Sequence, residues 1–210
     1  MVRSTTLATS ERSRLTQADR RARSRGALLE SAARGLSRYG YSNLVLDRVA
    51  SEAGYTRGAL YHQFANKEDL ALAVVAWVEE TWWAEMAQVV GDDADPVGAL
   101  MAVARAHAVY CRRDVARVMM TLRVEFSGQD HPVGRAVKEA EGRVLGEATR
   151  LIKAGRKNGA IPQGAPPGVM ALAYLGAVEG LVINLAGQAP FDEQLAESIV
   201  RGLLGLPAPR

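Results

Sequence analysis

Apolar residues recur through most of the chain at intervals of three and four positions, the spacing that places side chains on one face of an α-helix. The β-branched residues are not concentrated in the alternating runs that strands need. Glycine, proline and capping residues divide the pattern into nine segments, and we expect each segment to form a helix. The sequence therefore predicts an all-α protein.

The first predicted helix runs from Gln17 to Tyr39 and ends at Gly40, a residue type that adopts positive φ readily at a helix C-terminus. Its apolar face consists of Leu29, Ala32, Ala33 and Leu36. Residues 1–16 are rich in Ser, Thr and Arg and show no apolar periodicity. We expect a flexible basic arm there.

Two short helices lie close together between residues 46 and 64, and their connection is the most informative part of the sequence. Gly54 permits the backbone to turn with positive φ, and Thr56 is a good N-cap for the helix that follows. Leu60 and Phe64 are expected to face the core. This arrangement predicts a helix-turn-helix, for which the alternative is an ordinary corner between two packed helices.

Basic residues near this motif favour the helix-turn-helix. Four arginines stand at the start of the first helix, where cations oppose the helix dipole unless another group, such as a DNA backbone, uses them. These are Arg20, Arg21, Arg23 and Arg25. Residues 1–65 hold 11 Arg and five Asp or Glu, whereas the remainder holds 15 Lys or Arg and 18 Asp or Glu. The net charge of +3 thus averages a basic N-terminal part and a mildly acidic remainder, although a solvated basic tail without a partner would give the same numbers.

The stretch LDRVASEAGYTRGALYHQF (46–64), followed by NKEDL (66–70), resembles the signature of the TetR/AcrR family of bacterial transcriptional regulators. The similarity covers about residues 20–75, and the rest of the chain is similar only in length and helix order. The resemblance implies a homodimer, a palindromic double-stranded DNA operator, and a helical body that binds a small-molecule effector. By position it assigns DNA contacts to Thr56, Arg57, Gly58, Tyr61, His62 and Lys67.

The chemistry of these residues agrees with the assignment. Arginine at the N-terminal end of a recognition helix, as Arg57 would be, can bond bidentately to guanine O6 and N7. Gly58 permits close approach to the groove. Tyr61 and Lys67 are suited to phosphates, which fix the register on the duplex without selecting a sequence.

Polar residues ahead of apolar runs predict where several helices begin. The expected N-caps are Asn66, Asp95, Asp114, His131 and Asp192. The second helix departs from the family, whose members usually carry a capping Ser or Thr where this chain has Leu44-Val45. Asn43 is the substitute cap that the sequence offers.

Polar and aromatic residues interrupt the apolar faces of the C-terminal two-thirds of the chain. A wall of apolar side chains with a few polar groups is what a small-molecule pocket needs, and the family resemblance places the effector there. The candidate contacts are Trp82, Met86, His107, Tyr110, Met120, Arg123, Tyr174 and Glu179. For each residue taken singly, the alternative is a packed or hydrogen-bonded core position.

Residues 168–187 form a 20-residue apolar segment with one charge, so a membrane span is one interpretation. Glu179, Asn184 and four glycines argue against it, and no basic flank sets an orientation. Small residues such as Ala173 and Gly176 suit close helix contact instead. We expect this helix and the last one, with Leu195, Ile199 and Leu203, to form a dimer interface.

The sequence thus predicts a flexible arm (1–16), a helix-turn-helix domain (17–66) and an effector-binding and dimerisation domain (67–210). We expect a cytoplasmic regulator, since no N-terminal apolar stretch is present and Cys111 is the single cysteine. An enzyme, a metal site or a cofactor is not expected, because the three histidines lack ligand spacing and no phosphate-binding loop is present. The alternatives are an enzyme with an unrecognised site and a helical dimeric adaptor that binds protein.

Overall fold

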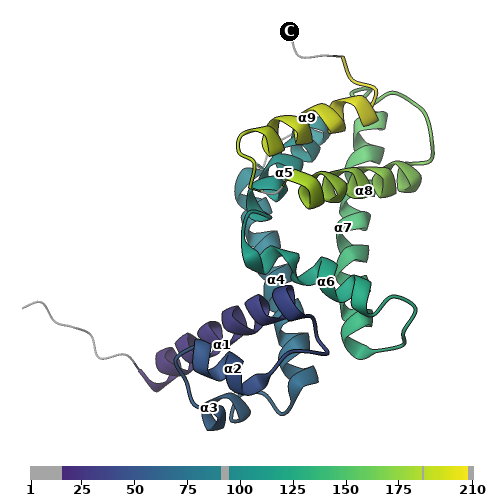
Figure 1. The fold of residues 1–210 in the computed structure, drawn as a ribbon. Helices are drawn as coiled ribbons and strands as arrows, with labels where there is room; N and C mark the ends of the chain where they lie inside the picture. Colours follow the sequence, from purple (N-terminus) through teal and green to yellow (C-terminus); the bar gives the residue numbers. More distant parts are fainter. Residues whose placement is uncertain (1–15, 91–94, 186, 208–210) are drawn as a thin grey trace, which may run out of the picture.

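The computed structural model describes residues 16–90, 95–185 and 187–207, which form nine α-helices and one 3-10 helix (Figure 1). Within those ranges there is no strand, so the all-α prediction is confirmed. The elements are α1 (Gln17–Tyr39), α2 (Leu46–Glu52), α3 (Arg57–Tyr61), α4 (Lys67–Val89), α5 (Pro96–Tyr110), η1 (Asp114–Arg117), α6 (Val118–Glu125), α7 (Pro132–Lys157), α8 (Pro167–Leu185) and α9 (Phe191–Leu203). The predicted basic arm lies, apart from Thr16, outside the described residues.

Two hydrophobic cores organise the helices. The first joins α1, α2 and α3 to α4, and it also contains Val118 and Leu122 of α6 and Val133 and Val137 of α7. The second joins α5, the C-terminal part of α7, α8 and α9. In Figure 1, α1–α3 gather at one end of the molecule and α8 and α9 at the other, with α4 and α7 extending between them. A domain boundary between residues 66 and 67 stays a prediction, since the first core continues into α6 and α7.

Four helices begin at the N-caps that the sequence predicts. The side chains of Thr56, Asn66, Asp95 and His131 each accept a hydrogen bond from a backbone N–H in the first turn of the following helix. Each bond satisfies a donor that has no partner within its own helix. These starts depend only on residues three or fewer positions away.

Two of the five expected N-caps, Asp114 and Asp192, are wrong. Asp114 begins the 3-10 helix instead, and its carboxylate pairs with Arg38 of α1 at 2.6 Å. Asp192 lies inside the first turn of α9, is 1% exposed, and accepts two hydrogen bonds from Arg112, at 2.7 and 2.9 Å. In both places the carboxylate forms an ion pair with a guanidinium from a distant part of the chain, so it does not cap the helix.

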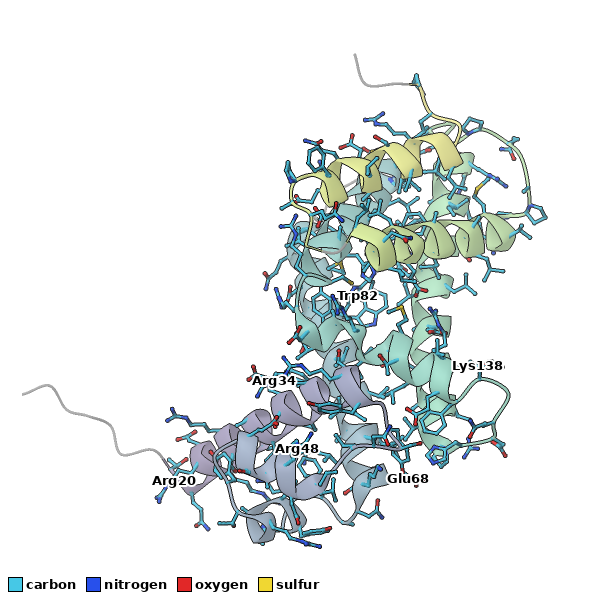
Figure 2. The ribbon with its side chains drawn as sticks, in the orientation of Figure 1. Arg20, Arg34, Arg48, Glu68, Trp82 and Lys138 are labelled. Atoms are coloured by element: carbon cyan, nitrogen blue, oxygen red, sulfur yellow. The ribbon has the colours of Figure 1, made fainter. Side chains whose placement is uncertain are left out.

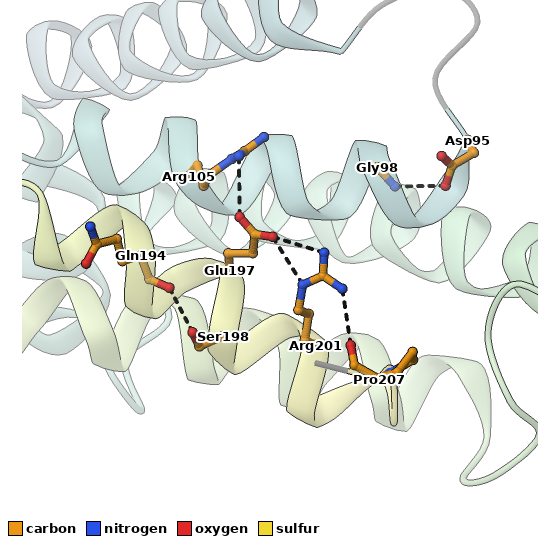
Figure 3. Close-up of polar contacts among 8 residues, drawn as sticks. All are labelled: Asp95, Gly98, Arg105, Gln194, Glu197, Ser198, Arg201 and Pro207. Atoms are coloured by element: carbon orange, nitrogen blue, oxygen red, sulfur yellow. Dashed lines mark hydrogen bonds and ion pairs between the residues drawn. The ribbon is translucent and has the colours of Figure 1, made fainter. Parts of the chain in front are cut away.

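The last helix is fixed to α5 and to the residues just after α5, at its start and at its middle. At one end Arg112, just after α5, holds Asp192 and also Glu193 (2.5 Å). Further along, Glu197 accepts from Arg105 of α5 at 3.4 Å and from Arg201 at 3.1 Å (Figure 3). These pairs orient α9, and with it the side chains on its outer face.

A carboxylate from α6 joins the N-terminal helices to the rest of the molecule. Glu125 accepts hydrogen bonds from Tyr41 N (2.6 Å), Ser42 N (2.7 Å) and Ser42 Oγ (2.6 Å) in the loop between α1 and α2. Gly40 stands beside it with φ 73°, and a Cβ there would lie 2.6 Å from Glu125 Oε2. The loop therefore needs glycine at this position for both its conformation and the close approach.

The apolar helix α8 passes a length and composition test for a membrane span, with a mean hydropathy of 1.7 and 22% of the tested window buried. Its outer face carries Val169, Leu172 and Ile183, each more than half exposed. Because an interface helix can meet the same test, this result alone does not separate the two predictions.

Candidate nucleic-acid interface and ligand site

The helix-turn-helix is assembled by local turn chemistry and a tight core. Gly54 adopts φ 77° between α2 and α3, and Thr56 Oγ1 accepts from Ala59 N at 3.2 Å. Leu60 and Phe64 are at most 1% exposed, as predicted. The buried Ser31 of α1 donates to Val49 O of α2 at 2.9 Å, which locks these two helices together.

The face of α3 opposite Leu60 is open to solvent. Arg57, Gly58, Tyr61 and His62 are all exposed, and Thr56 is exposed at the start of the helix. The five residues thus form one continuous polar surface on α3, in reach of an external partner. We call this surface the α3 face.

Arg57 is not free on this face. Its Nη1 lies 3.0 Å from Oδ2 of Asp47 on α2, and its guanidinium lies over the Tyr61 ring at 5.3 Å. The side chains of Arg57 and Asp47 are 65% and 58% exposed, so the pair is open to solvent. The sequence-based candidates do not include Asp47. Its negative charge, close in sequence to Arg57 of α3, is the signal that could have identified it.

Lys67, the predicted phosphate contact, is half-buried at the start of α4. Its Nζ donates to Ser42 O at 2.9 Å and lies 4.8 Å from the centre of the Tyr41 ring. Lys67 therefore supports the same loop that Glu125 holds. Asn43 does not cap α2, because its Nδ2 donates to Tyr39 O and Val45 occupies the cap position without a side-chain bond.

A hollow of about 600 Å³ adjoins the α3 face and is open to solvent. It is lined by Gln17, Arg20, Arg21, Ser24, Tyr55, Ala59, His62 and Gln63. Arg20 lies at the outer end of α1 (Figure 2), so the arginine cluster noted in the sequence adds cations beside the recognition helix. Gln63 donates to Ser24 Oγ at 2.9 Å, while its buried Oε1 has no partner within the described residues.

In the C-terminal part, two predicted effector contacts, Trp82 of α4 and His107 of α5, meet each other. Trp82 Nε1 donates to Nδ1 of His107 at 3.0 Å, and the Cys111 sulfur lies 3.5 Å from His107 Nε2. Burial lowers the pKa of His107, against a weaker opposing effect of Glu179, so the imidazole is neutral at pH 7. Burial also raises the pKa of the Cys111 thiol to about 12, which makes this cysteine unreactive.

Arg123 bridges two carboxylates from neighbouring helices. Its Nη1 lies 3.1 Å from Glu141 of α7 and its Nη2 lies 2.6 Å from Glu179 of α8. Burial raises the pKa of Glu141, while Arg123 opposes that shift. The arrangement gives α6 a polar attachment inside the C-terminal part, two residues before Glu125.

The other predicted effector contacts are buried or half-buried. Tyr174 OH donates to Leu100 O at 2.8 Å and Tyr110 OH to Val78 O at 3.4 Å, which satisfies both hydroxyls. Met86 is 3% exposed and Met120 is half-buried. A small hollow of about 30 Å³ brings together Trp82, Trp83, Leu100, Val103, Val144, Glu147, Ala148, Leu151 and Tyr174, room for about one water. Effector contact by the eight candidates stays a prediction.

No group of three or more His, Cys, Asp or Glu that could hold a metal ion occurs within residues 16–90, 95–185 and 187–207.

Comparisons with known proteins point in one direction. Residues 28–74 match the family described as bacterial regulatory proteins, tetR family. The chain is 34% identical over 136 residues to the HTH-type transcriptional repressor AcnR of Corynebacterium glutamicum, a match that covers 63% of this chain and 65% of AcnR. It is 27% identical over 178 residues to the A-factor receptor protein of Streptomyces griseus, covering 81% of this chain and 59% of the receptor. The matches thus span less than two-thirds of either relative.

Solved structures share the fold. AibR in complex with isovaleryl coenzyme A and operator DNA aligns with a TM-score of 0.72 at 22% identity, over 88% of this chain and 100% of AibR. A TetR-family transcriptional regulator from Streptomyces coelicolor aligns with a TM-score of 0.72 at 24% identity, over 88% of this chain and 95% of that protein. At these identities the agreement concerns the arrangement of helices.

Proposed function

We propose that this chain, whose residues 28–74 match the tetR family of bacterial regulatory proteins, is a member of that family and a sequence-specific, DNA-binding transcriptional repressor. A small-molecule effector would release it from a palindromic operator. The observation that carries the proposal is the α3 face: a helix whose back is fully buried through Leu60 while its front exposes an arginine, a tyrosine and a histidine.

Each residue of the α3 face has a role suited to a major groove. Arg57 supplies the bidentate donors that guanine O6 and N7 accept. Gly58 lets the helix backbone approach the bases, and Tyr61 and His62 face the backbone or outer bases. Thr56 holds the first turn and presents its hydroxyl toward a phosphate.

The basic hollow beside α3 supports the same interface. Arg20 and Arg21 line it together with His62, so phosphates next to the groove occupied by α3 would meet cations there. This gives the N-terminal arginines a partner that offsets their unfavourable position at the start of α1. Lys67 acts chiefly by supporting the loop before α2, and contacts a phosphate only through its remaining donors.

The exposed apolar faces of α8 and α9 support a homodimer. Leu172 and Ile183 on α8 are 58% exposed, and Phe191 and Leu195 on α9 are 61% and 42% exposed. A second copy would cover them, which favours an interface over a membrane span and accords with a cytoplasmic protein. Two α3 helices about 34–36 Å apart would then meet successive major grooves.

Release by an effector has a structural route through α6. Arg123 attaches this helix to Glu141 and Glu179 inside the C-terminal part, and Glu125 attaches it to the α1–α2 loop. An effector that changes the contacts of Arg123 would shift α6, and with it the loop that precedes the helix-turn-helix. The effector can shift the free-energy difference between the two arrangements by no more than the difference between its binding free energies for them.

We assign no catalytic role to the candidate effector contacts. In the proposal they bind a ligand and release it without changing it chemically. They are Trp82, Met86, His107, Tyr110, Met120, Arg123, Tyr174 and Glu179. The solved structure of AibR holds isovaleryl coenzyme A together with operator DNA, so one protein with this arrangement of helices binds both a small molecule and DNA.

Selection from random-sequence duplexes tests the proposal. The full-length protein should enrich an inverted repeat, and Arg57→Ala should lose enrichment at one base pair of each half-site. Arg150→Ala is the matched control, because it removes an arginine that pairs with Glu147 on α7, far from the α3 face. A wild-type protein that enriches no sequence would refute the proposed function and favour a protein-binding adaptor.

A further inference from the structure

The ion pair between Asp47 and Arg57 lies at the centre of the proposed DNA interface. Asp47 stands in the first turn of α2 and Arg57 at the first position of α3, so each belongs to a different helix of the motif. Their contact at 3.0 Å uses only Nη1 of the guanidinium and Oδ2 of the carboxylate. Within the described residues, Oδ1 of Asp47 has no hydrogen-bond partner.

Two groups therefore fix the direction of the Arg57 side chain before any DNA binds. Asp47 holds one amino group of the guanidinium, and the Tyr61 ring lies against the planar group at 5.3 Å. A guanidinium carries five N–H donors in a rigid fork, so Nη2 and Nε remain to form two bonds to one guanine. A side chain that is already oriented loses less conformational entropy when it binds.

The exposed carboxylate also restricts the neighbouring base. A carboxylate accepts hydrogen bonds but donates none, so in the major groove it can bond only to an amino group, that of cytosine N4 or adenine N6. A guanine or thymine edge at the same place would present acceptors to a negative charge. Oδ1 of Asp47 is the atom available for such a bond.

We propose that Asp47 is a specificity-determining residue: it positions Arg57 for a guanine and selects an adjacent base that carries an amino group. This inference rests on the proposed DNA-binding function. It also distinguishes Asp47 from a residue that merely neutralises Arg57. In that case removal of the carboxylate would free the arginine and strengthen binding to every DNA sequence, since phosphate attraction is independent of sequence.

A matched set of variants separates these possibilities. Asp47→Ala removes the carboxylate, and Asp47→Asn keeps its shape while removing its charge. Glu52→Ala is the control, because it removes the same charge from the same helix at an exposed position that has no ion pair within the described residues. The exposed Asp47–Arg57 pair contributes little to folding, so all three variants should keep the thermal midpoint of the wild type.

The measurement uses the duplex that the wild-type full-length chain enriches, together with duplexes that carry each single-base substitution at the half-site. Fluorescence anisotropy gives the affinity of each protein for each duplex. We expect Asp47→Ala to lower the preference for guanine, and for its amino-bearing neighbour, about tenfold, with binding to a scrambled duplex unchanged or tighter. Asp47→Asn should retain only a preference for adenine at the neighbouring position, and Glu52→Ala should match the wild type.

Equal base preferences in Asp47→Ala and the wild type would overturn the inference, as would tighter binding of Asp47→Ala to all duplexes with unchanged preferences. Both results leave the proposed function intact, because the wild type still selects its site. Failure of the wild type to discriminate among the duplexes would instead refute the function itself.

Discussion

The bonds that Glu125 makes to the α1–α2 loop predict a measurable cost of removing this side chain. Glu125→Ala deletes the acceptor of Tyr41 N, Ser42 N and Ser42 Oγ. A hydrogen bond to a charged group contributes about 1.5–3 kcal/mol, but the exposed donors of Ser42 regain water and Lys67 still holds Ser42 O. The half-buried N–H of Tyr41 carries most of the loss, so we expect the loop to be destabilised by about 2 kcal/mol.

Hydrogen exchange measures this local effect directly. A loss of about 2 kcal/mol corresponds to a roughly 30-fold lower protection of the Tyr41 and Ser42 amides. Glu139→Ala is the control, because this exposed carboxylate on α7 has no ion pair within the part of the chain that the structure describes. Protection of both amides within twofold of the wild type would refute the proposed attachment of the loop to α6.

Two further predictions concern α9 and the dimer. Asp192→Asn should lower the free energy of unfolding by about 2 kcal/mol in urea titrations, because Arg112 keeps its pair with Glu193 but its two bonds to residue 192 lose a charged acceptor. Hydrogen bonds from Arg112 lower the pKa of Asp192 below its unfolded value. The pair therefore stabilises the protein above about pH 4, and this stabilisation is lost as the pH falls through the folded pKa. Asp192→Asn should abolish that acid dependence of the free energy of unfolding. Leu172→Glu with Phe191→Glu should give monomers in analytical ultracentrifugation while helix content is kept, and dimers at the wild-type concentration would contradict the proposed interface.

Much of the fold is predictable because its determinants are local. The caps at Thr56 and Asn66 follow from a polar side chain placed three residues before the N–H that it accepts from. The buried positions of Leu60 and Phe64 follow from helical spacing alone. The start of α7 at His131 follows in the same way from the proline after it.

The failures have a common physical cause. Asp114 and Asp192 have the sequence context of caps, but Arg38 and Arg112 lie 76 and 80 residues away and take their carboxylates. The order of acidic and basic residues along the sequence does not determine which of them form ion pairs in the folded protein. Long-range ion pairs are therefore outside what a local pattern predicts.

The same reason limits the site. The α3 face was predictable from the motif, whereas the contact between Asp47 and Arg57 depends on how α2 crosses α3. Likewise, Glu125 gave no sequence signal, because its partners Tyr41 and Ser42 are about 84 residues earlier in the chain. In the C-terminal part, two of the predicted effector contacts, Trp82 and Tyr174, line a small hollow.

The measurement that tests the central claim most directly is the affinity of the full-length protein for its enriched duplex and for a scrambled duplex, as a function of salt concentration. The account predicts at least a 10³-fold preference for the enriched duplex near physiological salt, with both affinities falling steeply as salt increases. Equal affinities for the two duplexes at every salt concentration would contradict it.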